Sequence, residues 1–599
     1  MTAINEIFIE RKFPGRKDSV IFRGKTALLQ IRRGFEDVVI NRTVRNAKDS
    51  SLLGEPVIAT STTPLWTEIE PEERFLVAGK IQNLRLAIRQ LDGLEIPANE
   101  VFSFWKYVGR SSRFKGYVKG RELREGCIIP NIGGGLCQIS NALYDAALQA
   151  NFEIIERHAH TQIVTGSLAE EDRDATVFWN YIDLRFCSEK PFRIEAKLND
   201  KELTVRFKGG KKPLQPVHRI SRKAVHEDLP QSCATCEMGD CHRVVDPAEH
   251  RDFGKTAFLV DEYSAEFDTY VQANRTSKDE LFIPLDGIRF KKQNYAWTTK
   301  GFSRHRQSFA VTAVRSYKSR KLAAQGKARQ LNLLAMYEKL AESYARKLTF
   351  DVLHLVVQQN LLPFFWKNGH LGGRTFDVLM TAFPMEEIQK RLDRAYFLHP
   401  ESKTLGDFRT DDSLIAAESE ALRHAKNIIT SHNGIAALFG SKSKLLDWQM
   451  PAELLIERPI NKKPRIVFPA ATVGRKGCYE LREALRGLDA TLILLGPQIE
   501  GSDFWNGFTT EKGSEWSADA DLVVLPAYVE HKPRRLLLAA ASGIPVIASK
   551  ACGLENVEGI DSIEAGDVIA LRNNILHHVA HIGARVSGLE YRLDMQKHC

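Results

Sequence analysis

The chain has 599 residues, of which 43% are hydrophobic and 27% are charged, and 84 basic against 75 acidic residues give a formal net charge of +9. This is the composition of a globular protein, and the length favours more than one domain. The charge is too small for this length to indicate nucleic-acid binding, although it suits an acidic ligand, such as a nucleotide sugar, or an anionic membrane face.

The start of the chain, MTAINEIFIERKFPGRK, lacks the apolar segment of a secretory signal. No window offers the roughly 18 uninterrupted apolar residues of a membrane-spanning helix. The nine cysteines are odd in number and unevenly placed, which in a cytosolic chain indicates thiols or metal ligands rather than disulfides. We therefore expect a cytoplasmic protein.

Residues 1–210 are expected to form one α+β domain with its core at 77–210. Its first 75 residues mix polar loops with short β-like runs such as DVVINRTV (37–44). Beyond them, the periodicity predicts an amphipathic helix at 76–91, a strand entering a turn at 97–109, a helix at 137–150, and a hairpin at 192–209 that turns at Asn199 and Asp200.

The stretch NIGGGLCQIS (131–140) places Gly133, Gly134 and Gly135 just before a helix that starts with Cys137. A thiol in the first turn of a helix lies near unpaired N–H groups and the positive end of the dipole, which favour a thiolate. The glycines leave room for a substrate near the backbone, and their N–H groups suit an anion or an oxyanion. Helical spacing separates an apolar face, with Ile139, Leu143, Ala146 and Ala147, from a polar face with Cys137, Ser140, Asn141 and Tyr144.

Downstream, IIERHAHTQIV (154–164) is predicted to be a strand, in which alternation puts His158 and His160 on the same face. Asp174 follows in DRDATV (172–177). A cysteine nucleophile, a histidine base and an orienting carboxylate are thus available in order. The alternative is that the glycines make a tight turn, Cys137 is a small core residue and the histidines bond locally.

Six spaced blocks resemble the VanW-like family over roughly residues 95–190: FSFWKYVG (102–109), GY (116–117), GGGLCQISNALYDAAL (133–148), EIIERHAHT (153–161), DATV (174–177) and DLRF (183–186). This family is associated with the cell envelope and with vancomycin-resistance gene clusters, and its biochemical activity is not established. The resemblance implies a signature made of Gly133, Gly134, Gly135, Cys137, Gln138, Arg157, His160 and Asp174. The chain departs from the family pattern with Trp105 for a frequent Asn, Thr161 for Ser and Arg173 for Gly.

Residues 211–254 are expected to be a basic linker followed by a cysteine-rich metal knuckle. The segment SCATCEMGDCHRVV (232–245) has the pattern C-x2-C-x4-C followed by a histidine. Two thiolates at the C-x2-C spacing can bind one metal ion, and the third cysteine adds a ligand. A structural zinc site is predicted, and an iron–sulfur cluster and unliganded cysteines are the alternatives. The ligands would be Cys233, Cys236 and Cys241, with His242, His226 or His250 as the fourth.

From residue 255 onward, short apolar runs alternate with helical stretches, which predicts parallel, doubly wound sheets. The runs are TAFLVDEY (256–263), FDVLHLVV (350–357), TFDVLMTA (375–382), AKNIITS (425–431), PRIVFPA (464–470), ATLILLG (490–496), DLVVLPA (521–527) and IPVIAS (544–549). They predict two Rossmann-like α/β domains, at 255–450 and 451–599.

The segment ADLVVLPAYVEHKPRRLLLAAASGIPVIASKACGLE (520–555) resembles the nucleotide-binding half of GT-B glycosyltransferases of the group 1 type, with looser similarity over 255–575. The resemblance implies a donor-contacting acid at Glu530, and implies that Arg475 and Lys476 neutralise a diphosphate. The chain departs from the pattern at Leu538, where the second glutamate of an E-x7-E pair would stand. It also departs in the adjacency of the two basic residues and in lacking a glycine-rich loop after the first strand.

Together these patterns predict a cytoplasmic protein of envelope or polysaccharide assembly that transfers a sugar from a nucleotide donor to a glycan or lipid-linked acceptor. The VanW-like domain would bind or modify the acceptor. His354 and His432 are candidates for a polar group in the cleft, and the basic stretch 317–330 is either a solvated face or a contact with an anionic membrane. The alternatives are a Cys137-dependent acyl transferase or hydrolase, and a non-catalytic binding protein on a degenerate GT-B scaffold.

Overall fold

The structure is a computed structural model that describes residues 16–39, 46–66, 73–124, 127–160, 167–210, 231–232, 253–321, 326–407, 409–452, 461, 463–513 and 520–581. The chain divides into two compact units. Unit 1 comprises Met1–Lys255, Thr349–Leu353 and Asn368–Thr375, and unit 2 comprises Thr256–Leu348, His354–Lys367 and Phe376–Cys599. In the described ranges, no helix combines the length and apolar character needed to cross a bilayer.

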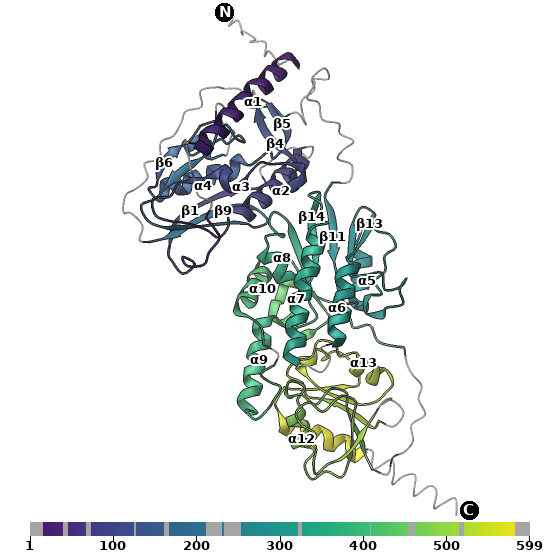
Figure 1. Cartoon of the computed structure of the whole chain (residues 1–599). Helices are drawn as coiled ribbons and strands as arrows, with labels where there is room; N and C mark the ends of the chain where they lie inside the picture. The colour runs from purple at the N-terminus through teal and green to yellow at the C-terminus, as the bar shows by residue number, and fades with distance from the viewer. Residues whose placement is uncertain are drawn as a thin grey trace, which may run out of the picture. The chain divides into compact units, whose positions relative to one another are not determined.

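Unit 1 combines helices with three small sheets (Figure 1). Its elements are α1 (Arg16–Val39), β1 (Val57–Pro64), α2 (Arg74–Leu91), β2 (Leu94–Ile96), β3 (Phe102–Ser103), α3 (Phe104–Val108), β4 (Lys119–Arg124), β5 (Cys127–Ile132), α4 (Cys137–Gln149), β6 (Glu153–Glu156), β7 (Arg185–Cys187), β8 (Phe192–Leu198), β9 (Glu202–Gly209) and β10 (Gln231–Ser232). The sheets have the strand orders β1-β9-β8-β2, β3-β7-β6 and β10-β5-β4.

The β8–β9 hairpin shows how the sequence builds the core of unit 1. Alternate residues of the two strands are buried, among them Ile194 in β8 with Val205 and Phe207 in β9, so one face of the sheet is apolar. Helices α2 and α4 pack against this sheet, α2 on β8 and α4 on β1 and β9. The hairpin turns at the predicted place. There the Asn199 side chain accepts hydrogen bonds from the backbone amides of Lys201 and Glu202.

The β-like run predicted at 37–44 is wrong for 37–39, which are the last residues of α1. This helix contacts the rest of unit 1 through polar groups, since Gln30 donates to Trp179 O at 3.0 Å and Arg33 pairs with Glu156. Its large apolar side chains recur at the spacing of a helix, but the structure leaves them exposed. They are Val20, Ile21, Leu28, Ile31 and Phe35.

Unit 2 contains two larger sheets with helices around them (Figure 1). The first consists of β11 (Lys255–Leu259), β12 (Glu280–Ile283), β13 (Arg304–Gln307), β14 (Val352–Gln358), β15 (Thr375–Leu379), β16 (Ile428–Thr430) and β17 (Ser443–Leu445). The second consists of β18 (Arg465–Phe468), β19 (Thr491–Leu494), β20 (Thr509–Lys512), β21 (Leu522–Leu525), β22 (Val546–Ser549) and β23 (Ile560–Ile563). The helices of unit 2 include α5 (Ala265–Asn274), α6 (Phe309–Lys321), α7 (Gly326–Ala345), α8 (Leu362–Lys367), α9 (Met385–Leu398), α10 (Asp412–His424), α11 (Asn433–Phe439), α12 (Cys478–Ala484) and α13 (Arg534–Ala541), and a further helix spans 568–581.

Both sheets of unit 2 have the strand order of a Rossmann fold. The first runs β13-β12-β11-β14-β15-β16-β17 and the second β20-β19-β18-β21-β22-β23, so in each the chain starts in the middle, builds one half and then crosses over. The registered pairs on both sides of the second crossover, β18–β19 and β18–β21, are parallel. This arrangement confirms the predicted fold class, an α+β domain followed by a pair of doubly wound α/β domains. In such sheets, ligands bind at the carboxyl ends of the strands that flank the crossover.

Candidate functional sites

The three glycines of the sequence motif have distinct structural roles. Gly133 and Gly135 have φ angles of 81° and 97°, in the region that side chains disfavour. Gly134 has no such angle, but a Cβ atom there would collide with the backbone of Gly120 in β4. The turn therefore needs glycine both for its shape and for its close approach to β4.

The space beside these glycines is filled by the protein itself. A Cβ atom on Gly133 would meet the side chain of Ser111, and one on Gly135 would meet Lys80. The amides of Gly133 and Gly134 donate to backbone carbonyls, at 3.1 and 2.9 Å. The expectation that all three glycines open the backbone to a substrate is therefore wrong for this turn, because neighbouring side chains and strands occupy that room.

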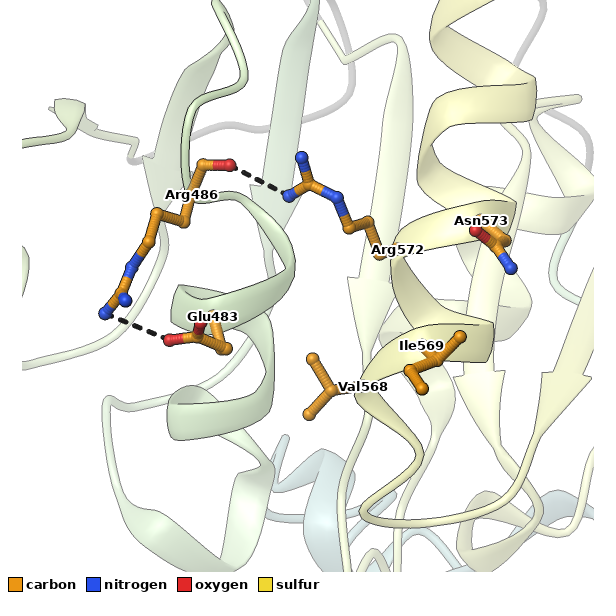
Figure 2. A pocket seen from close by; sticks show the side chains of 6 residues that line it. All are labelled: Glu483, Arg486, Val568, Ile569, Arg572 and Asn573. Atoms are coloured by element: carbon orange, nitrogen blue, oxygen red, sulfur yellow. Dashed lines mark hydrogen bonds and ion pairs between the residues drawn. The ribbon is translucent and has the colours of Figure 1, made fainter.

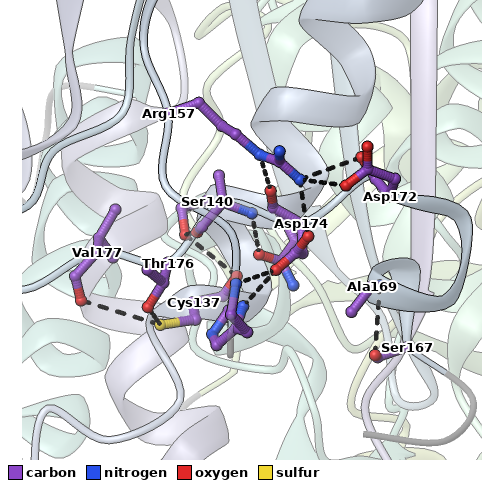
Figure 3. Close-up of polar contacts among 12 residues, drawn as sticks. Cys137, Ser140, Arg157, Ser167, Ala169, Asp172, Asp174, Thr176 and Val177 are labelled. Carbon is purple, nitrogen blue, oxygen red and sulfur yellow. Dashed lines mark hydrogen bonds and ion pairs between the residues drawn. The ribbon is translucent and has the colours of Figure 1, made fainter. Parts of the chain in front are cut away.

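Helix α4 starts at Cys137, in agreement with the prediction, and brings its thiol to a polar cluster (Figure 3). The Cys137 Sγ lies 3.7 Å from Thr176 Oγ1 and 3.9 Å from Val177 O. The His160 side chain lies beside the thiol, where its hydrogen bonding and charge lower the pKa of Cys137. On its other side, His160 Nδ1 donates to Asp174 Oδ2 at 2.7 Å. The three residues predicted from their order in the sequence thus form one continuous chain of contacts.

Asp174 is held by several donors. Arg157 Nε donates to Asp174 O at 2.7 Å and Arg157 Nη2 to Asp174 Oδ1 at 2.9 Å, while the His160 amide donates to Asp174 Oδ2 at 2.6 Å. The polar face of α4 fixes the next residue, because Ser140 Oγ donates to Ala175 O and the Ala175 amide donates to Asn141 Oδ1. These contacts orient the carboxylate toward His160.

The electrostatics of the cluster favour a charged thiol–imidazole pair. Burial opposes ionisation of Cys137, but the hydrogen bond and the charge of His160 lower the pKa of the thiol below its ordinary value. Burial alone would lower the pKa of His160, whereas its hydrogen bonds to Asp174 and Cys137 raise this pKa above its ordinary value. Asp174 stays ionised, because bonds from His160 and the charge of Arg157 outweigh burial and lower its pKa.

Other predicted residues lie outside this chain of contacts. The predicted strand 154–164 ends at Glu156 as β6, so His158 and His160 do not share a strand face. The His158 side chain is half exposed and lies 3.7 Å from Glu156. Gln138 donates to Thr63 Oγ1 and Pro64 O and so anchors α4 to β1. Tyr144 packs under the Arg157 guanidinium, 5.0 Å from its ring centroid, and helps to position that arginine.

A second polar cluster lies at the crossover of the second sheet of unit 2. Lys476 follows β18 and Glu530 follows β21, and Lys476 Nζ lies 2.8 Å from Glu530 Oε2. The other carboxylate oxygen accepts from the amides of His531 and Lys532, at 2.8 and 2.9 Å. Gly477, with a φ of 75°, brings this loop so close to Pro526 that any Cβ would collide with its carbonyl oxygen.

Charge and burial determine the protonation states of Glu530 and Lys476. Burial would raise the pKa of Glu530, but the charge and hydrogen bond of Lys476 lower it to about 2. Burial lowers the pKa of Lys476 and that of Arg475, and Glu530 opposes the shift in both. The cluster is therefore an ionised carboxylate with two buried cations beside it.

Groups from the first sheet lie across this cluster within unit 2. His432, after β16, is buried, and its Nε2 lies 3.1 Å from Ala551 O while its Nδ1 accepts from the Ile435 amide. Ion pairs join Glu262 to Lys532 and Glu266 to Arg534. Of the two histidines predicted for the cleft, His432 lies between the sheets. His354 lies near the start of β14, 3.4 Å from Asp377 in β15, and so at the opposite end of the strand from the crossover loops.

Comparison with known proteins identifies a family domain within unit 1. Residues 79–208 match the family model described as "VanW like protein". These residues form a VanW family domain. The chain is 36% identical over 117 residues to the uncharacterized protein YoaR of Bacillus subtilis (strain 168), covering 19% of this chain and 38% of YoaR. It is 30% identical over 154 residues to the vancomycin B-type resistance protein VanW of Enterococcus faecalis, covering 24% of this chain and 54% of that protein.

Solved structures similar to this chain include several glycosyltransferases. Sucrose-phosphate synthase from Thermosynechococcus elongatus is 15% identical, with 57% of this chain and 100% of that chain covered and a TM-score of 0.35. Anabaena HepE in complex with UDP-glucose is 15% identical, with 56% and 94% covered and a TM-score of 0.33. Because both scores are low, the fold of unit 2 is assigned from its own two sheets. The sequence matches cover 38% of YoaR and 54% of the Enterococcus faecalis protein, so this chain spans less than two thirds of the length of either relative.

A pocket of about 350 Å³ lies on the second sheet's half of unit 2, between α12 and the helix at 568–581 (Figure 2). Arg572 closes one side by donating to Ala484 O and Arg486 O at 2.8 Å each. None of the predicted site residues lines it. It therefore lies apart from both polar clusters.

The metal knuckle at Cys233, Cys236, Cys241 and His242, like His226, His250 and Thr161, lies outside the described residues. Within the described ranges, no group of three His, Cys, Asp or Glu side chains is arranged to hold a metal ion.

In the VanW domain, Ser140, Asn141 and Thr176 support the thiol site but were not predicted to do so. The polar face of α4 was the available signal for the first two.

Proposed function

We propose that unit 2 is a glycosyltransferase-type enzyme that binds a nucleotide sugar at the carboxyl ends of β18 and β21. The observation that carries this proposal is the Lys476–Glu530 pair at the crossover of a sheet with Rossmann strand order. Buried cations beside an ordered carboxylate suit a diphosphate linked to a sugar, since the cations neutralise phosphate charge and the carboxylate accepts hydroxyl hydrogen bonds. The sequence similarity to group 1 GT-B enzymes in 520–555 points the same way.

In this proposal, Arg475 and Lys476 hold the diphosphate and Glu530 accepts hydrogen bonds from the ribose or the transferred sugar. The Lys476–Glu530 contact occupies both side chains, so the donor phosphate competes for Lys476. The acceptor is a glycan or a lipid-linked glycan of the envelope or of a polysaccharide, and the VanW domain binds or modifies it. The cytoplasmic location, the peripheral membrane contact of 317–330, the structural zinc and the domain boundaries at 210, 254 and 450 stay predictions.

Donor binding is testable by thermal shift with UDP-glucose, other UDP-sugars and GDP-sugars. A donor at about 100 times its Kd is expected to add about 2.7 kcal/mol to the stability of unit 2. Lys476→Ala is expected to weaken binding about 10- to 100-fold, because it removes a charged hydrogen bond to phosphate. The matched control is Lys550→Ala, since Lys550 forms an exposed pair with Glu564 in the same half.

The wild-type result decides this proposal without reliance on any variant. If no nucleotide sugar shifts the transition of the intact chain, the donor site does not exist. If a donor binds but no nucleoside diphosphate is released with any acceptor glycan, unit 2 is a binding module, which is the non-catalytic alternative.

A further inference from the structure

We propose that the VanW domain is a second, independent active site, in which Cys137 is the nucleophile, His160 the general acid–base and Asp174 the positioning carboxylate of an acyl-transfer reaction on an amide or ester. This proposal does not depend on the function of unit 2. The three side chains come from separate segments, the start of α4, the residues after β6 and the loop at 172–177, and only the fold brings them together.

The other described cysteines with buried side chains show what a structural thiol looks like in this chain. Cys478 and Cys552 are fully buried in the core of unit 2, and burial raises the pKa of each thiol. Cys552 also lies 3.9 Å from a hydroxyl and a carbonyl, those of Ser549 and Leu525. Cys137 differs from both thiols in being only partly buried, in lying beside the His160 imidazole and in having a lowered pKa. A residue with only a structural role would resemble the first two, and Cys137 does not, although it also packs against the core of unit 1.

The carboxylate in this chain of contacts is buried, whereas the imidazole and the thiol are both partly exposed. The Asp174 side chain is 1% exposed, the His160 side chain is 18% exposed, and Cys137 is partly buried. Because Nδ1 of His160 donates to the buried carboxylate, the other ring nitrogen is the one available to the thiol. This is the arrangement of nucleophile, base and orienting acid that activates a thiol.

The start of α4 also provides donors for an oxyanion. Gly133 and Gly134 have their amides engaged, but in the described part of the chain the amides of Leu136 and Cys137 donate to no backbone carbonyl. They lie in the first turn, where the helix dipole favours negative charge. An acyl carbonyl oxygen placed there would be stabilised as it becomes an oxyanion.

The contacts favour acyl transfer over other thiol chemistry. A thiol phosphatase needs a free arginine over the phosphate, whereas the Arg157 guanidinium is engaged with Asp172 and Asp174. A dithiol redox pair needs a second cysteine, and no described cysteine contacts Cys137. A basic imidazole oriented by a carboxylate serves proton transfer, which acyl transfer requires in both half-reactions.

The reaction balances with these groups alone. The Cys137 thiolate attacks the acyl carbon, a C–S bond forms, and the carbonyl electron pair moves to oxygen. As the carbonyl re-forms, the C–N or C–O bond breaks and the imidazolium of His160 gives its proton to the leaving amine or alcohol. Water or an acceptor amine then attacks the thioester, His160 takes its proton, and the thiolate leaves as the new acyl product forms.

The test is alkylation of the full-length protein with iodoacetamide, followed peptide by peptide. Cys137 is expected to react at neutral pH at least about ten times faster than Cys187, whose pKa is raised by burial and by Glu153. Its rate is also expected to reach a plateau at lower pH than that of Cys187. With p-nitrophenyl acetate, a mass increase of one acetyl group on Cys137 is expected.

Variants separate catalysis from folding. His160→Ala is expected to remove the fast alkylation and the acetylation, whereas His158→Ala, which changes a half-exposed histidine two residues away, leaves both unchanged. Asp174→Asn is expected to slow acetylation and to move its pH profile upward, which a purely structural role would not do. Equal reactivity of Cys137 and Cys187 in the wild-type protein, which requires no variant to fold, would overturn the proposal.

Discussion

Replacing Asp261 by alanine is expected to lower the free energy of unfolding of unit 2 by about 3–5 kcal/mol, because it leaves a buried charge without its partner. Asp261 lies just after β11 and is fully buried, and its carboxylate accepts from both terminal nitrogens of Arg315 at 2.8 and 2.7 Å. It also accepts from Asn360 Nδ2 at 2.6 Å. Arg315 is itself only 5% exposed, so water cannot replace the lost carboxylate.

The measurement is urea unfolding followed by tryptophan fluorescence. Trp297 is a suitable probe, because it is fully buried and its Nε1 donates to Asp261 O at 2.9 Å. The matched control is Glu386→Ala, which breaks an exposed ion pair with Lys390 one helical turn away, and no measurable change is expected there. If the two variants unfold at the same urea concentration, the buried pair does not stabilise the first sheet.

This pair also limits what the crossover of the first sheet can bind. The Asp261 amide donates to Gln358 Oε1 at 2.6 Å, so the loops after β11 and β14 are joined by their own polar groups. At the second crossover, the carboxylate of Glu530 is likewise engaged, and its partner Lys476 also donates to Val529 O at 2.9 Å. In the proposed function, a donor phosphate competes with these two acceptors for the lysine. The two crossovers therefore share a strand order, but the first carries a buried aspartate–arginine pair and the second a glutamate–lysine pair.

The sequence predicted all the interior strands of unit 2 except β12, and it predicted none of the edge strands β13, β17, β20 and β23. All eight apolar runs are strands, because a strand buried on both faces is apolar throughout. The edge strand β20 has four exposed residues, Thr509, Thr510, Glu511 and Lys512, and thus no apolar signal. Edge strands β13 and β17 are also polar or exposed, so only the tertiary pairing defines them.

The thiol site was predicted in its residues and mispredicted in its local structure. The segment after Glu156 was expected to continue as a strand, whereas side-chain bonds from Arg157 and to the His160 amide hold it without a ladder partner. Such bonds join residues 14 to 17 positions apart, and local periodicity contains no trace of them. Residue type and order therefore indicated the chemistry better than the predicted strand did.

Replacing Gly134 by alanine is expected to destabilise unit 1 by about 3 kcal/mol, since the new methyl group would overlap a backbone that cannot move alone. Strand β4 passes between two glycines: Gly79 of α2 approaches the carbonyl of Lys119, and Gly134 approaches that of Gly120. Because Gly134 does not have a positive φ, the substitution tests this close approach without a backbone penalty. The control is Gly54→Ala, since Gly54 has no neighbour within 4 Å, and little change is expected.

The same substitution separates two roles of the glycine turn. Amide hydrogen exchange, measured by peptide, is expected to show faster exchange in β4 and α2 of the Gly134→Ala protein, with unit 2 unchanged. If the turn positions the start of α4, iodoacetamide labelling of Cys137 will also slow, because the thiol moves away from His160. Faster exchange in β4 with undiminished labelling would show that the glycines serve only the packing of the strand, and that α4 is held in place by its bonds to the Asp174 loop and to β1.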